Sequence, residues 1–192
     1  MANEAPSPAA HTAVLVEGES DRNAVLALAR RSGRNLADEG IAVVTMGGVT
    51  NVDHHVRRWG PAGLGIRLLG LCDRPEAPYF ERAFTRASLP TGAGGALAGG
   101  SGFFVCCDDL EDELIRALGV EAIVAFIEAS GELRAFRTLQ RQPAQRDRTV
   151  EQQLHRFIGT RSGRKRSYGG GLVARLASDA VPRPLADLLA CL

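Results

Sequence analysis

The sequence is poor in several residue types, and each scarcity excludes a class of protein. Its four cysteines, Cys72, Cys106, Cys107 and Cys191, lack the paired spacing of a zinc site, and we expect them to be reduced thiols. No apolar run approaches the roughly 20 residues of a membrane helix, so we expect no membrane partner. Residues 1–10 lack the basic and apolar regions of a signal peptide, which predicts a disordered N-terminus and a cytoplasmic protein. With 192 residues and 45% hydrophobic content, the chain can form one compact core.

Lysine is the scarcest charged residue, because Lys165 is the only lysine among the 23 basic residues. Residues 1–133 hold 11 arginines against 18 acidic residues. Residues 134–175 hold 10 arginines and Lys165 against only Asp147 and Glu151. An acidic body joined to a basic segment predicts a polyanion-binding surface beside a pocket that attracts cations. A solvated, arginine-rich helical face would give the same pattern.

Short apolar runs alternate with segments long enough for a helix. The predicted strands are residues 13–16, 41–46, 66–72 and 103–107, and the predicted helices that follow strands are residues 21–31, 51–59 and 109–119. This alternation indicates an α/β fold with a mostly parallel four-stranded sheet flanked by helices. From about residue 120 the pattern is helical, with breaks at Pro143 and Pro182. We therefore expect a core of residues 11–130 and a helical, arginine-rich C-terminal extension of residues 131–192.

The glycine-dense stretch "TGAGGALAGGSG" (91–102) is the one segment that suggests a phosphate-binding loop. It lacks the G-K-[ST] ending of a nucleotide-binding P-loop and runs into a strand instead of opening a helix. We interpret it as a surface loop and predict no ATPase within this sequence.

Carboxylates follow three of the predicted strands. Glu17 ends the first, Asp73 the third, and Asp108 and Asp109 the fourth, with Glu111 and Glu113 close behind. In open α/β sheets, ligands bind outside the carboxyl ends of the strands, so these acids should meet at one rim. Their mutual repulsion would be costly without a neutralising charge. Oxygen-only ligands suit Mg²⁺ or Mn²⁺, and the sequence therefore predicts a metal site.

The motifs, taken in order, resemble the Toprim domain, and most closely that of the OLD (overcoming lysogenization defect) nucleases. The matching segments are "VEGESD" (16–21), "TMGGVTN" (45–51), "GLCDRPE" (70–76), "DLEDEL" (109–114) and "GTRSGRKRSY" (159–168). The resemblance implies a Toprim/Rossmann-like fold and catalytic roles for Glu17, Asp73 and Lys165. It also implies two Mg²⁺ or Mn²⁺ ions, one held by Glu17, Asp21 and Asp73 and the other with help from Glu111 and Glu113.

One motif departs from the family pattern. The expected D-x-D reads Asp73-Arg74-Pro75, so the second aspartate is missing. Glu76, Asp108 or Asp109 substitutes for it, or one metal site is weakened. Glu113 has a further interpretation as a helix-surface partner of Arg116, three residues on.

The resemblance implies a divalent-metal-dependent nuclease that hydrolyses phosphodiester bonds in DNA, with RNA left open, in phage defence or DNA repair. Arg161, Arg164 and Arg166 would contact neighbouring phosphates. The alternative is a catalytically weak or inactive Toprim module that binds nucleic acid or a separate ATPase. A receiver-like phosphoacceptor at Asp73 fits Arg74-Pro75 poorly, and the chain is too short for a topoisomerase cleavage domain. The C-terminal segment "VPRPLADLLACL" is apolar on one face and could join two copies in a homodimer.

Overall fold

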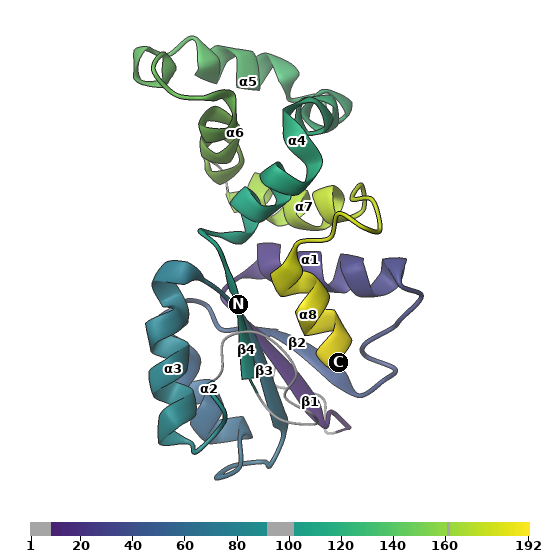
Figure 1. The fold of residues 1–192 in the computed structure, drawn as a ribbon, viewed down its shortest axis with the longest axis vertical. Helices are drawn as coiled ribbons and strands as arrows, with labels where there is room; N and C mark the ends of the chain where they lie inside the picture. The colour runs from purple at the N-terminus through teal and green to yellow at the C-terminus, as the bar shows by residue number, and fades with distance from the viewer. Residues whose placement is uncertain (1–8, 92–101, 161) are drawn as a thin grey trace.

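The computed structural model describes residues 9–91, 102–160 and 162–192, and it contains one parallel sheet (Figure 1). The strands are β1 (Thr12–Val16), β2 (Ile41–Thr45), β3 (Arg67–Asp73) and β4 (Gly102–Cys106), in the order β2-β1-β3-β4. All three pairings are parallel, with Val14 opposite both Val43 and Leu69. The predicted α/β class, the strand positions and the parallel sheet are confirmed. Residues 1–8 and 92–101, and with them most of the predicted N-terminal tail and glycine-dense loop, lie outside the described residues.

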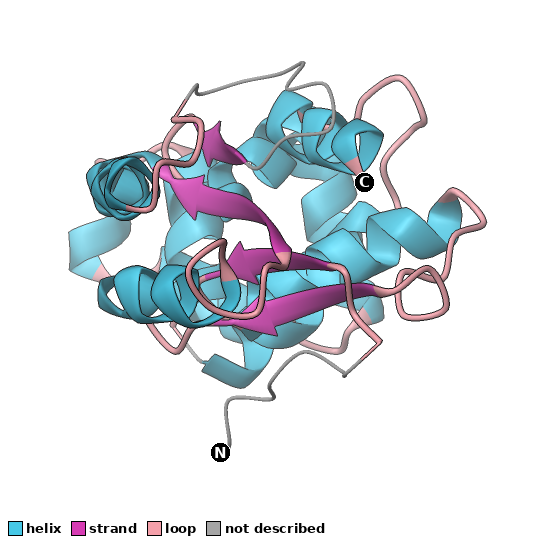
Figure 2. Ribbon diagram, turned by 90° about the horizontal axis from the view of Figure 1, so that it is seen from below, coloured by secondary structure: helices cyan, strands magenta, loops and turns pink. Residues whose placement is uncertain are grey.

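Helices cover both faces of the sheet (Figures 1 and 2). They are α1 (Glu19–Arg31), α2 (Val52–Trp59), α3 (Ala77–Arg86), α4 (Leu110–Ala129), α5 (Leu133–Gln140), α6 (Val150–Gly159), α7 (Ser162–Val173) and α8 (Arg183–Cys191), with short 3₁₀ turns η1 (Val49–Asn51), η2 (Arg74–Glu76) and η3 (Pro143–Gln145). Alternate residues of β1 point to opposite faces. Ala13 and Leu15 pack in one core with α2 and α3, whereas Val14 and Val16 pack in the other with α1, α7 and α8. Burial on both faces explains the unbroken apolar runs of the strands.

The second half of α4 forms a helical lobe with α5 and α6, which extends away from the sheet (Figure 1). Gly119, where we predicted the end of a helix, has φ 77° and kinks α4 at the base of this lobe. Helices α7 and α8 then return, α7 against α1 and α8 against β3 and β4. Leu172 and Leu185 share a core with Val14. The C-terminal region is helical as expected, and its last two helices contribute side chains to the core on one face of the sheet.

The sequence reading missed helix α3, although its start carries a clear signal. The stretch "DRPE" (73–76) combines an N-cap aspartate, a proline in the first turn and a glutamate at the third position, which together form a capping box. Phe80, Ala83 and Phe84 then bury one face of α3. Gly70 in β3 leaves the room that Phe80 needs, because a Cβ there would lie 2.4 Å from the Phe80 ring.

Candidate metal centre and the cleft beside it

Three carboxylates meet at the carboxyl edge of β1 and β3. Glu17 directly follows β1, Asp73 is the last residue of β3, and Glu76 ends the turn after it. One carboxylate oxygen from each lies within 4.8 Å of the other two. β1 and β3 are neighbours, while the chain after β1 crosses to β2 on the other side, so the cluster occupies the point where the strand order reverses. We call Glu17, Asp73 and Glu76 the acid cluster.

Glu76, one of the three predicted substitutes for the missing second aspartate, lies beside Asp73 in the acid cluster. In a 3₁₀ turn, side chains three residues apart eclipse each other, which sets Glu76 beside Asp73. A Glu76 carboxylate oxygen also accepts a hydrogen bond from the Asp73 backbone N–H at 3.3 Å. The two other candidates lie elsewhere, since Asp108 is exposed and Asp109 caps α4 by accepting from the Asp112 N–H at 2.8 Å. Of the three possible substitutes, the geometry therefore favours Glu76.

Burial and mutual repulsion raise the pKa values of three carboxyls at this rim. Burial, a hydrogen bond with Glu17 and the charge of Glu17 raise the pKa of Glu76 to about 8. Burial and the charges of Asp21, Asp109 and Glu111 raise the pKa of Asp73 to about 7. The pKa of Asp21, mainly through burial and the nearby Glu111, rises to about 6. Oxygen donors that repel one another in a partly buried site fit a hard divalent cation, which would replace the protons.

A second group joins Asp21, Glu111 and Lys165 beside the acid cluster. Glu111 is buried, and its two oxygens contact the Ser20 hydroxyl at 2.9 Å and the Lys165 Nζ at 3.1 Å. Burial alone would lower the pKa of Lys165, but the charges of Glu111, Asp21 and Asp73 and a hydrogen bond with Glu111 raise it. Lys165 thus reaches the acidic rim from α7, more than 50 residues away in sequence from Glu111.

Glu113 is hydrogen-bonded to the backbone just after β4 and paired with an arginine of α4. One of its oxygens accepts from the Cys107 backbone N–H at 2.8 Å, and the other lies 3.4 Å from the Arg116 guanidinium. Glu111 and Glu113, the residues predicted to help hold a second ion, therefore each contact a protein cation. Within residues 9–91, 102–160 and 162–192, the acid cluster is the only set of three or more potential ligands close enough to share one metal ion.

An open cleft adjoins the acid cluster. Its walls include the acids Glu17 and Asp21, the basic residues Lys165 and Arg166, and the Gly47–Gly48 turn. Gly47 and Gly48 have φ values of 69° and 118°, which favour glycine and leave the turn without side chains. The cleft thus has carboxylates, cations and bare backbone around one space.

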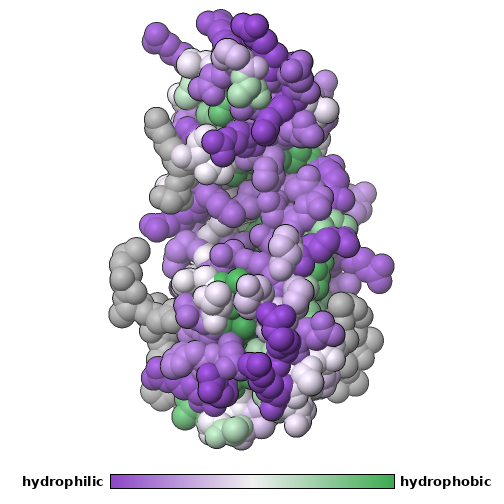
Figure 3. All heavy atoms as spheres, turned by 90° about the vertical axis from the view of Figure 1, so that its left-hand side faces the viewer, coloured by the Kyte–Doolittle hydropathy of each residue, from purple (hydrophilic) through white to green (hydrophobic). Residues whose placement is uncertain are grey.

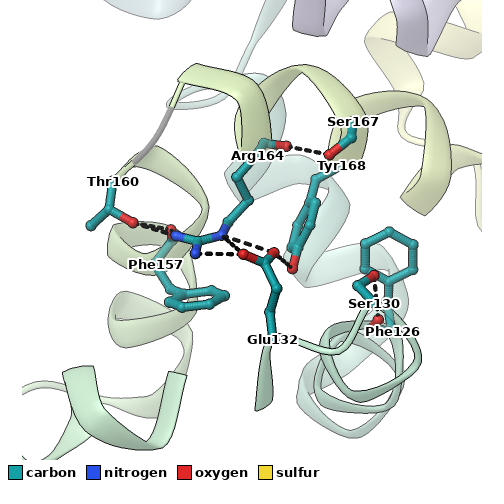
Figure 4. A network of polar contacts seen from close by, with 8 residues as sticks. All are labelled: Phe126, Ser130, Glu132, Phe157, Thr160, Arg164, Ser167 and Tyr168. Carbon is teal, nitrogen blue, oxygen red and sulfur yellow. Dashed lines mark hydrogen bonds and ion pairs between the residues drawn. The ribbon is translucent and has the colours of Figure 1, made fainter. Parts of the chain in front are cut away.

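Arg164 does not face this cleft, contrary to our expectation that it contacts phosphates. Its side chain is 3% exposed and forms hydrogen bonds with Glu132, Thr160 and the Phe157 carbonyl oxygen (Figure 4). A guanidinium buried in this way has no face left for a phosphate. Arg166 is exposed at the cleft as expected, and Arg161 lies outside the described residues.

The sequence reading also missed Ser20, Glu132 and His155. The imidazole of His155 lies 2.5 Å from an Asp109 oxygen. Burial opposes ionisation of Asp109, but the hydrogen bonds from His155 and the Asp112 N–H lower its pKa, while the contact with Asp109 raises the pKa of His155. No spacing rule links His155 to Asp109, which precedes it by 46 residues, so only the packing of α6 against α4 reveals the pair.

Comparisons with known proteins give a family model and several solved structures that are similar to this chain. Residues 10–74 match the family model described as overcoming lysogenization defect protein-like, TOPRIM domain. The C-terminal region of the Xanthomonas campestris pv. campestris OLD protein, phased with mercury, is 25% identical, with a TM-score of 0.66 over 95% of this chain and 94% of that chain. The same region phased with iodine is 27% identical, with a TM-score of 0.65 over 95% of this chain and 93% of that chain.

A third solved structure, the C-terminal region of the Burkholderia pseudomallei OLD protein, shares the fold. It is 23% identical, with a TM-score of 0.64 over 94% of this chain and 96% of that chain. A comparison with curated proteins gives no match. Among the described helices, none combines the length and the apolar character needed to cross a membrane. Residues 10–74 therefore resemble an OLD-like Toprim domain, and the chain shares its fold with the C-terminal regions of OLD proteins.

Proposed function

We propose that this chain is a divalent-metal-dependent phosphodiesterase that cleaves DNA. One observation carries the proposal: Glu17, Asp73 and Glu76 bring their oxygens within 4.8 Å of one another beside a cleft that Lys165 and Arg166 also line. A cation-binding cluster and a cationic wall around one space suit a phosphodiester, whose charge the wall attracts. The OLD-like Toprim match at residues 10–74 supports the same reaction class.

The acid cluster would hold Mg²⁺ or Mn²⁺. When bound there, the cation would supply a Lewis acid and lower the pKa of a bound water. Asp21 lines both the cleft and the niche of the acid cluster, and its pKa of about 6 suits a carboxylate that accepts a proton from the attacking water. Lys165 would contact a non-bridging phosphate oxygen, and the side-chain-free Gly47–Gly48 turn would let the backbone of the nucleic acid approach.

The helical lobe offers a surface for the rest of the DNA. Arg134, Arg137 and Arg141 are exposed and follow the i, i+3, i+7 spacing of a single helix face. Hydrophilic side chains gather over the end of the molecule that carries α5 and α6 (Figure 3). We assign to these three arginines the sequence-independent phosphate contacts that we had expected of Arg164.

Salt dependence tests this assignment. Replacing Arg134, Arg137 and Arg141 with glutamine should make the slope of log affinity against log salt shallower by about two to three units for duplex DNA. The matched control replaces Arg82, Arg86 and Arg183, which are also exposed but lie on α3 and α8. Equal slopes for the two triple variants would refute a dedicated surface on the lobe.

A second candidate function is a Toprim module that binds nucleic acid or an ATPase without cutting. Two ion pairs favour it, because Glu111 is paired with Lys165 and Glu113 with Arg116. In the described residues, only the acid cluster then remains as a compact group of potential metal ligands. A mechanism that requires two ions would then lack its second set of ligands.

Nicking of supercoiled plasmid with Mg²⁺ or Mn²⁺ separates the two candidates. The wild-type protein should convert plasmid to open circles, and Glu17→Gln and Glu76→Gln should each reduce the rate by at least about a hundredfold. Glu81→Gln, the same charge change at an exposed position of α3, should retain the wild-type rate. DNA binding without metal-dependent nicking in the wild-type protein would favour the non-catalytic module.

A further inference from the structure

Two neighbouring residues of α7 point to different parts of the molecule. Lys165 extends to Glu111 at the acidic rim, with 3.1 Å between Nζ and the carboxylate. The side chain of Arg164 instead enters the helical lobe, where it ends on Glu132. Arg164 is therefore bound to the helical lobe, whereas Lys165, the next residue, reaches the acidic rim of the sheet.

The Arg164 contact is a network of hydrogen bonds around a buried guanidinium and not a single ion pair (Figure 4). Glu132, the residue before α5, accepts hydrogen bonds from Arg164 Nε at 3.0 Å and Nη2 at 2.7 Å, and from the Tyr168 hydroxyl at 2.6 Å. The Arg164 Nη1 donates to the Phe157 carbonyl oxygen at 2.8 Å and to the Thr160 hydroxyl at 2.5 Å, and the guanidinium lies 3.7 Å above the Phe157 ring. Arg164 therefore links α7 to α6 through Phe157 and, through Glu132, to the start of α5.

The opposite face of α7 is fixed to α1. The Ser20 hydroxyl lies 3.1 Å from the Lys165 carbonyl oxygen, and the Asn23 amide donates to the Arg166 carbonyl oxygen at 3.0 Å. Gly169 permits this approach, because a Cβ there would lie 2.6 Å from the Ser20 carbonyl oxygen. The backbone around Lys165 is thus held from two sides, by α1 and by the Glu132 network.

The geometry points to Glu132 as a positioning residue for Lys165, acting through Arg164 and Tyr168. Lys165 has a long, flexible side chain that is 40% exposed, so the place of its ammonium depends on where the helix backbone is held. Loss of the Glu132 charge leaves Arg164 buried without a counter-charge, and the start of α7 must shift to solvate it. The helical lobe thereby becomes part of the active site, an inference that rests on the function proposed above for Lys165.

Because Lys165 is the only lysine, its ammonium can be observed directly. Protein labelled with [¹⁵N]lysine gives one side-chain ¹⁵Nζ signal, whose reference for a broken Lys165–Glu111 pair is Glu111→Gln. In metal-free protein, Glu132→Gln should move the signal toward that reference. Glu128→Gln, the same charge change at an exposed position one turn earlier, should leave the signal at its wild-type position. An unmoved signal in folded Glu132→Gln would overturn the proposal.

Kinetics supply a second test. On plasmid DNA, Glu132→Gln should lower kcat by about tenfold to a hundredfold with little change in KM, as a displaced catalytic group does. In a Lys165→Gln background, Glu132→Gln should cause no further loss, since it acts only through the lysine. Additive losses would refute the proposal. Should Glu132→Gln fail to fold, Tyr168→Phe removes one hydrogen bond of the network, and the same two outcomes apply to it.

The two proposals fail in distinguishable ways. A wild-type protein without nuclease activity would refute the proposed function, yet the ¹⁵Nζ signal would still report whether Glu132 positions Lys165. An active wild-type protein with an unmoved signal and additive kinetic losses would refute only the role of Glu132.

Discussion

Binding of Mg²⁺ or Mn²⁺ to the acid cluster should expel protons, in a number that the pKa values of the ligands determine. With a pKa of about 8, Glu76 is about nine-tenths protonated at pH 7, and Asp73, with a pKa of about 7, is half protonated. A cation must displace those protons to reach the oxygens. We therefore expect the release of between about one and one and a half protons per cation at pH 7, falling to about a tenth of a proton at pH 9.

The same protons set the pH dependence of affinity. Proton competition at Glu76 and Asp73 should make cation binding about tenfold tighter at pH 8 than at pH 7. Isothermal titration calorimetry in buffers of different ionisation enthalpy measures both the number of protons released and the apparent Kd. Glu76→Gln should lower the release at pH 7 to about half a proton, because only Asp73 still titrates near that pH.

Glu81→Gln is the control for this experiment, since Glu81 is exposed on α3 and its loss should leave the release unchanged. A release below about a quarter of a proton at pH 7, with a Kd that does not change between pH 7 and 8, would refute the reasoning. The carboxyls would then be ionised before metal binds, and their burial and mutual repulsion would not shape the site.

Three further changes have outcomes that the structure determines. Asp21→Asn should raise the free energy of unfolding by about 1–3 kcal/mol in chelator at pH 8, because it removes a charge that burial and Glu111 disfavour. A lower free energy of unfolding in urea denaturation would contradict this. Gly169→Ala should lower the free energy of unfolding by about 1–3 kcal/mol, because the added Cβ would meet Ser20. Gly163→Ala, with open space around it, should change the free energy of unfolding by less than about 1 kcal/mol. Equal effects would show that the α1–α7 contact is loose. The raised pKa of His155 gives stability that is present below pH 6.5 and lost as pH rises through the folded-state pKa. His155→Gln should therefore remove that pH-dependent part of the free energy of unfolding, which is under about 1 kcal/mol. An unchanged pH profile of the urea midpoint would contradict this.

The acidic rim could be predicted from sequence because strand direction alone decides where the side chains after a parallel strand lie. Glu17 and Asp73 follow neighbouring strands, and no other information was needed to bring them together. Glu76 was harder, because its place depends on the short turn that Pro75 and the capping box favour. The sequence carries that signal in "DRPE", although Pro75 stands where the D-x-D pattern has its second aspartate.

The orientation of α7 could not be predicted in the same way. A helix usually shows its buried face as an apolar stripe, but "SGRKRSYGGGLV" has three glycines where it contacts α1 and α4. Glycines at a close helix contact give no hydrophobic pattern, so Arg164 and Arg166 looked equivalent. Only the packed structure shows that one is buried on Glu132 and the other lies at the cleft.

The number of acids at strand ends overstates the number of cations that the site requires, because three of the six predicted there have a protein counter-charge. Glu111 is paired with Lys165, Glu113 with Arg116, and Asp109 with His155. Glu17, Asp73 and Glu76 differ, since in the described part of the chain they have no ion pair with a basic side chain, and the pKa values of Asp73 and Glu76 are raised. Repulsion among the acids is therefore relieved locally at three positions by lysine, arginine and histidine. Only the carboxylates of the acid cluster still need a divalent cation to neutralise them. An experiment that counts bound Mg²⁺ or Mn²⁺ ions in the absence of DNA should therefore find one ion per chain.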